Sequence, residues 1–181
     1  MNNPLKPLFG LLICYFVITP LFSADYYWVG NRGNWSDLSH WATTSGGITK
    51  HTSLPTRNDN VFIDNNSFAP STREDIVLDL NDVYCNNFSA TRGAFLNIIG
   101  IDKRINIYGN CDIQRQSGVG AFDGSLVFRS NNPASKSINF TDYHVRNVIF
   151  DDPNGTWSMN GSILVDNLLA IRDGHVTFED D

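Results

Sequence analysis

The chain has 181 residues and a formal net charge of −6, a length that suits one domain with a substantial core. Its mild acidity and lack of basic clusters argue against nucleic acid and anionic membrane surfaces as partners. Asn and Asp are abundant and good helix formers are scarce, while Ile, Val, Phe and Tyr are frequent. This composition predicts many short strands joined by tight turns.

Residues 1–24 predict an export signal. Lys6 supplies a positive charge ahead of the continuous apolar run 8–22, which has signal-peptide length and is short for a membrane span. Ser23 and Ala24 offer a small-residue cleavage point. We expect a mature chain without a membrane span that is secreted or held at the cell surface, with a retained N-terminal anchor as the alternative.

Residues 25–70 form a Trp-rich region that contains Trp28, Trp35 and Trp41. Two interpretations compete for these rings. Exposed rings would stack on sugars and form a carbohydrate platform, whereas buried rings would cover the open first coil of a β-structure and its unpaired strand edge. The intervening Gly30 and Gly33 permit tight loops that fold the rings back over such an end. We favour an aromatic-rich N-terminal cap.

Residues 71–181 alternate short apolar runs with Gly, Asn, Asp or Pro, which predicts strand after strand. No window after the signal has convincing helical periodicity. The predicted strands are 76–80, 83–88, 95–99, 105–108, 111–113, 126–128, 138–140, 145–150, 156–159, 163–165, 168–171 and 176–178.

Two all-β architectures fit these strands. An antiparallel β-sandwich predicts longer strands with hairpin turns, whereas a right-handed parallel β-solenoid predicts short strands and a weak repeat of about 20–25 residues. A loose repeat beginning with Asn occurs at Asn87, Asn110, Asn147 and Asn167. The solenoid is therefore the favoured architecture.

Cys85 and Cys111 remain after signal removal, in a compartment where disulfides persist. Their separation approximates one solenoid coil, and adjacent coils lie about 4.8 Å apart, within reach of a disulfide. A bridge between them and a pair of buried free thiols are both compatible with the sequence.

Two stretches of the Trp-rich region resemble the start of large secreted Bacteroidetes-type β-repeat surface proteins of adhesin-like character. They read WVGNRGNWSDLSHW at 28–41 and LPTRNDNVFIDNNSF at 54–68, and the later LVFRSN and NVIFDDPNGTWSM resemble the strand repeats of those proteins. The resemblance implies an exported β-solenoid that is usually multidomain and ends in a sorting domain. This chain stops directly after a strand signal, so we expect a truncated solenoid or an end covered by something else.

Sites for chemistry are weakly indicated. The chain contains no metalloprotease, nucleophile-elbow, P-loop or dinucleotide motif. Asp59, Asp64 and Asn65 form the richest oxygen cluster and are weak calcium candidates. Asp151, Asp152 and Asp173 are available as paired carboxylates for glycoside cleavage, although turns ordinarily contain such residues.

The sequence thus predicts a secreted, non-enzymatic β-solenoid segment with an adhesive or structural role at the cell surface. Carbohydrate, extracellular matrix and another surface protein are its expected partners. The alternative is a fragment of a polysaccharide-degrading β-helix protein, either a lyase or a glycoside hydrolase.

Overall fold

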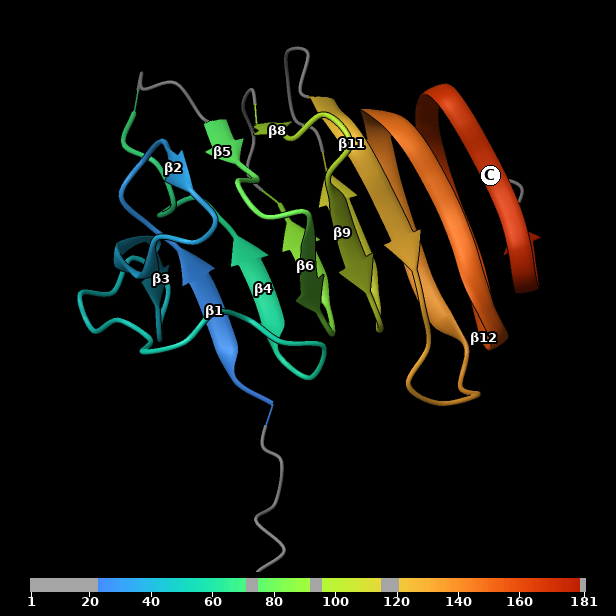
Figure 1. The fold of residues 1–181 in the computed structure, drawn as a ribbon, viewed down its shortest axis with the longest axis horizontal. Helices are drawn as coiled ribbons and strands as arrows, with labels where there is room; N and C mark the ends of the chain where they lie inside the picture. The colour runs from blue at the N-terminus through green and yellow to red at the C-terminus, as the bar shows by residue number, and fades with distance from the viewer. Residues whose placement is uncertain (1–22, 71–74, 92–95, 115–120, 180–181) are drawn as a thin grey trace, which may run out of the picture.

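The computed structural model describes residues 23–70, 75–91, 96–114 and 121–179 (Figure 1). Within these ranges the regular structure is almost entirely β, and the single helical element is the short 3₁₀ turn η1 (Leu38–His40). The strands are β1 (Asp25–Trp28), β2 (Gly33–Asn34), β3 (Trp41–Ala42), β4 (Asn60–Ile63), β5 (Asp75–Val77), β6 (Asp82–Cys85), β7 (Phe88–Ala90), β8 (Asn97–Ile99), β9 (Arg104–Ile107), β10 (Cys111–Gln114), β11 (Ala121–Phe128) and β12 (Lys136–Phe178).

The strands stack in three parallel columns. The first column contains β1, β4, β7, β10 and the start of β12. The second contains β2, β5, β8, the start of β11 and part of β12, and the third contains β6, β9 and the following parts of β11 and β12. Figure 1 shows this stack running from the blue end of the chain to the red end. The predicted parallel β-solenoid is confirmed, and the antiparallel sandwich is wrong because every pair within the columns is parallel.

The core lies inside the coils, where residues of successive turns meet in register. In the first column Phe88 pairs with Val61 on one side and with Cys111 on the other, and Cys111 pairs in turn with Ile138. All four side chains are buried because alternate strand residues point inward. Burying each large apolar side chain contributes about 1.5–3 kcal/mol relative to exposure.

The coil corners are tighter than the sequence suggests. The predicted strand 83–88 is wrong in extent, because the chain turns at Asn86 and Asn87 and passes from β6 in one column to β7 in another. Conversely, the six strands predicted after residue 137 belong to the continuous β12, which bends around its corners. Gly161 (φ +77°) and Gly174 (φ +93°) supply left-handed residues within it.

The Trp-rich region contributes to the stack itself. β1 and β2 are the first described members of two columns, paired with β4 and β5. β3 lies antiparallel to β1 on the edge away from β4, with Trp28 opposite Trp41. A strand edge that would otherwise present free backbone groups is therefore paired.

At the other end of the described stack, large apolar side chains are exposed along the last part of β12. They are Leu164, Leu168, Leu169, Ile171 and Phe178. None of the described helical segments is long and apolar enough to cross a membrane.

Candidate functional site

The three tryptophans of the N-terminal region form one buried aromatic cluster. Trp28, Trp35 and Trp41 are at most 1% exposed. Trp41 meets the other two rings edge to face, with centroid distances of 5.0 Å to Trp28 and 4.7 Å to Trp35. Its Nε1 donates to the Trp35 carbonyl at 2.8 Å, which satisfies the polar tip of the ring. A carbohydrate platform made of these rings is wrong, because no ring face is open to a ligand.

The local sequence holds His40 against this cluster. The His40 ring stacks on Trp28 with a centroid distance of 4.7 Å, and its Nδ1 lies 2.7 Å from the Val29 carbonyl oxygen. A Cβ at Gly33 would lie 2.0 Å from His40 Nε2, so only glycine allows this approach. The histidine therefore takes part in packing.

The calcium candidates are not brought together. Asp59 precedes β4 and Asp64 follows it, so about five residues of extended chain, roughly 16 Å, separate them. Asp59 accepts hydrogen bonds from Thr56 N and Oγ1 and from Ala24 N. Asp64 Oδ1 accepts from Asn66 N in a turn, and Asn65 lies between these two residues. This geometry therefore does not support the weak calcium candidates of the sequence as one site.

The two cysteines are free, buried thiols. Cys85 pairs with Ile107 in the third column, whereas Cys111 pairs with Phe88 and Ile138 in the first. Of the two states that the sequence allowed, the structure therefore shows buried free thiols and not the disulfide, and the two residues lie in different columns, out of register. Burial raises the pKa of both thiols, so the reactive thiolate is disfavoured.

Two of the three carboxylates considered for glycoside cleavage, Asp151 and Asp152, already have partners within the protein. Asp151 Oδ2 lies 3.2 Å from Arg129 Nη1 and 3.8 Å from Arg172 Nη1. Asp152 accepts from the backbone N–H groups of Ser130 and Asn154. These carboxylates bind groups of the protein itself, and the third candidate, Asp173, is an exposed residue next to Gly174.

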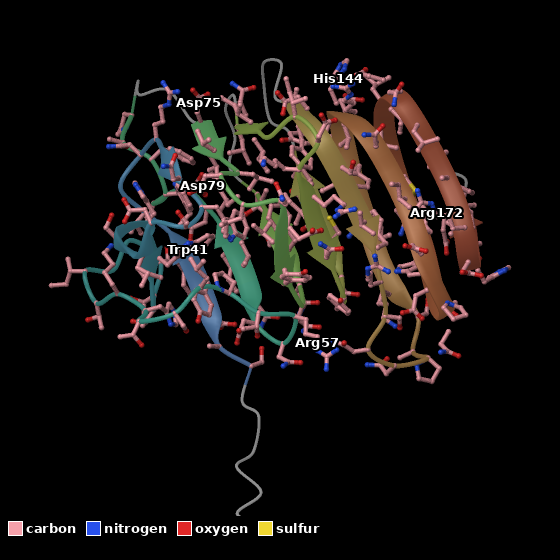
Figure 2. All side chains as sticks on the ribbon, in the orientation of Figure 1. Trp41, Arg57, Asp75, Asp79, His144 and Arg172 are labelled. Atoms are coloured by element: carbon pink, nitrogen blue, oxygen red, sulfur yellow. The ribbon has the colours of Figure 1, made fainter. Side chains whose placement is uncertain are left out.

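The histidines are dispersed. His51 stacks on Tyr26 with a centroid distance of 3.6 Å, and His144 lies 3.4 Å from Asp166 at the upper rim in Figure 2. Within the described ranges, no three His, Cys, Asp or Glu side chains gather closely enough to hold a metal ion.

An open groove lies on the outer side of the third column. Pro55, Thr56, Arg57, Tyr84 and Tyr108 line a volume of about 370 Å³. Tyr84 is the outward residue of β6, between the buried Val83 and Cys85, and is 41% exposed. Arg57 enters from the loop before β4 and lies at the lower rim in Figure 2. We call these five residues the tyrosine groove.

The tyrosine groove was not predicted from the sequence. The alternation Val83, Tyr84, Cys85 does indicate an outward tyrosine. Its meeting with Tyr108 and Arg57, however, depends on which residues the coils place side by side. The apolar pattern of a single strand does not predict how one coil aligns with the next.

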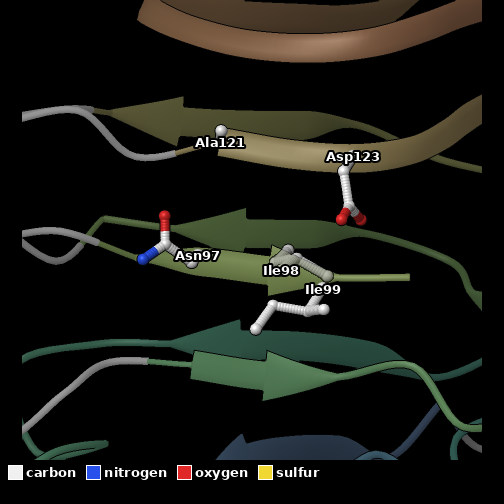
Figure 3. Close-up of a pocket in the computed structure, with 5 residues that line it drawn as sticks. All are labelled: Asn97, Ile98, Ile99, Ala121 and Asp123. Carbon is white, nitrogen blue, oxygen red and sulfur yellow. The ribbon is translucent and has the colours of Figure 1, made fainter. Parts of the chain in front are cut away.

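Two further depressions are lined in part by polar side chains, several of which already form hydrogen bonds within the protein. Figure 3 shows Asn97, Ile98, Ile99, Ala121 and Asp123 around a volume of about 280 Å³ between neighbouring coils. In it, Asp123 Oδ1 accepts from Gly100 N and Asn97 Nδ2 donates to Asp75. A third, of about 260 Å³, is lined by Ser130, Asn131, Asn132, Pro133, Asp152 and Asn154.

The chain matches no protein-family model, no curated protein and no solved structure in the comparisons with known proteins.

Proposed function

We propose that this chain is an exported, non-enzymatic β-solenoid segment with an adhesive or structural role at the cell surface. The apolar run within residues 1–24, which lie largely outside the described ranges, supports export. The resemblance of residues 28–41 and 54–68 to Bacteroidetes-type surface proteins supports the location. Carbohydrate, matrix or another surface protein would be the partner.

The observation that carries this proposal is the use of polar side chains to connect successive coils. Asn60, Asn87 and Asn110 occupy the same place in consecutive turns. Asn87 Nδ2 donates to Asn60 Oδ1 at 2.9 Å, and Asn87 Oδ1 accepts from Asn110 N at 2.7 Å. Such ladders suit an elongated scaffold that keeps its shape outside the cell, and two of the carboxylates considered for catalysis, Asp151 and Asp152, also bind groups of neighbouring coils or turns.

The buried indoles fit this role as an N-terminal cap. They lie beside β3, which covers the edge of β1, and so they would shield the interior of the first coil from water. The cap protects a scaffold and does not supply a binding face.

Two measurements test the proposal. Antibody labelling of intact cells, with and without protease treatment, should detect the protein at the surface or in the medium. Incubation of the purified protein with neutral and acidic polysaccharides should release no new reducing ends and no unsaturated products. If the protein cleaves a polysaccharide and Asp151→Asn abolishes that activity, the polysaccharide-degrading alternative replaces the proposed scaffold role. Detection of the protein only inside the cell would contradict the proposed location.

A further inference from the structure

We propose that the tyrosine groove binds a carboxylated sugar, such as a uronic-acid residue of an acidic polysaccharide. This inference rests on the proposed surface role and names the ligand class for it. The residues of the groove are separate from the buried tryptophan cluster.

The aromatic part of the groove comes from two adjacent coils. Tyr84 in β6 pairs with Asn106 in β9, and Tyr108 follows two positions later. Tyr108 N donates to the Cys85 carbonyl at 3.1 Å, which holds its backbone against the preceding coil. Tyr108 lies just past the end of β9, on the coil next to β6, and its side chain and that of Tyr84 line the same groove. Tyrosine offers an apolar ring face for the C–H side of a pyranose and a hydroxyl for its polar rim.

The rigid floor beside these rings is the loop before β4. Asp59 accepts from both Thr56 N and Thr56 Oγ1, which fixes the loop conformation. Asn131 Nδ2 donates to the Arg57 carbonyl at 3.3 Å from a loop 74 positions later in the chain. The groove is therefore held in place from two sides and needs little ordering when a ligand binds.

The positive charge of Arg57 favours a negatively charged group on the ligand. With the residues that the structure describes, its exposed side chain forms no hydrogen bond or ion pair. The acid closest in sequence, Asp59, binds Thr56 and Ala24, and Asp82, two residues before Tyr84 in β6, binds Arg104 at 2.7 Å. An exposed guanidinium without a partner offers a fork of donors that matches a carboxylate.

The experiment measures binding to the mature protein by isothermal titration calorimetry. The probes are trigalacturonate, which carries carboxylates, and cellotriose, a neutral sugar of the same length. The variants are Arg57→Gln, Tyr84→Ala and Tyr84→Phe. Arg146→Gln, in an exposed residue outside the groove, is the charge-matched control, and thermal melts verify that each variant folds.

We expect trigalacturonate to bind more tightly than cellotriose. Arg57→Gln should weaken trigalacturonate binding about 10-fold or more, since hydrogen bonds to charged groups are stronger than neutral ones, and should leave cellotriose unaffected. Tyr84→Ala should weaken the binding of both sugars, and Tyr84→Phe should weaken it less, because it keeps the ring and removes only the hydroxyl. Arg146→Gln should bind like the parent.

Three results would overturn the inference: no binding of either sugar, equal binding of both, or loss of binding in Arg146→Gln as large as in Arg57→Gln. These failures leave the scaffold role intact, because surface labelling and the absence of turnover do not depend on the groove. Conversely, turnover or an intracellular location would reject the proposed function whether or not the groove binds sugar.

Discussion

Asn110 N donates a hydrogen bond of 2.7 Å to the side-chain oxygen of Asn87, one coil earlier. The same Asn87 side chain donates to Asn60 Oδ1 at 2.9 Å, and Asn110 Oδ1 accepts from Ser137 N at 2.9 Å. The chain thus builds a ladder at the corner that leads into the first column. This relation explains why Asn recurs at intervals near the coil length.

Replacing Asn87 by Ala should destabilise the fold. The substitution removes the bond to Asn60 and leaves Asn110 N without its acceptor, at a cost of about 1–3 kcal/mol. Urea denaturation followed by circular dichroism measures the loss. Asn154→Ala, at an exposed position of β12, is the matched control and should change stability by less than about 0.5 kcal/mol. Equal stability of both variants would contradict the ladder.

Replacing Trp35 by Ala should be more damaging. The ring is 1% exposed and packs against Trp41, so its removal leaves a cavity and costs about 3–5 kcal/mol. Ile48→Ala, at a residue that is 92% exposed, should melt like the parent protein. If Trp35→Ala also melts like the parent, the indole does not contribute to a packed core.

Cys85 and Cys111 should behave as protected free thiols. Because burial raises the pKa of each thiol, little thiolate forms at neutral pH and iodoacetamide should react slowly with the native protein. Both cysteine-containing peptides should be alkylated fully after unfolding without a reductant. Detection of a peptide in which Cys85 is joined to Cys111 would contradict the assignment of both residues as free thiols.

Acid should weaken the contact between Asp82 and Arg104. The hydrogen bond from Arg104 lowers the pKa of the Asp82 carboxyl below its ordinary 3.8, helped by Asn106. A group whose pKa is lowered by folding stabilises the protein above its unfolded pKa, and that stability is lost as pH falls through the lower, folded pKa.

Melting temperatures measured from pH 7 down to pH 2 test this contact. Asp82→Asn should lower the melting temperature modestly at neutral pH, because the pair is partly exposed to solvent, and should reduce the loss of stability on acidification. Asp102→Asn, at an exposed residue in a turn, is the control and should show the full acid sensitivity of the parent. An Asp82→Asn variant with that same full sensitivity would contradict the pair's role.

The sequence by itself determined the fold class. Alternating apolar residues such as Val61 and Ile63 require strands with one buried face, and frequent Asn, Asp and Gly allow the corners between them. The recurrence of Asn87 and Asn110 also indicated the coil length correctly, because both residues serve the same corner. Strand ends were less well predicted, since a solenoid corner at Asn86 needs far fewer residues than an ordinary loop.

Only the tertiary structure decided which residues share a site. Burial of Trp28, Trp35 and Trp41 excluded them as a sugar platform, and the register placed Cys85 and Cys111 in different columns. The tyrosine groove joins a loop to two coils, and its existence depends on the register between distant segments. Local patterns specify which face of a strand is apolar, but the position of one coil on the next is set by packing of the whole stack.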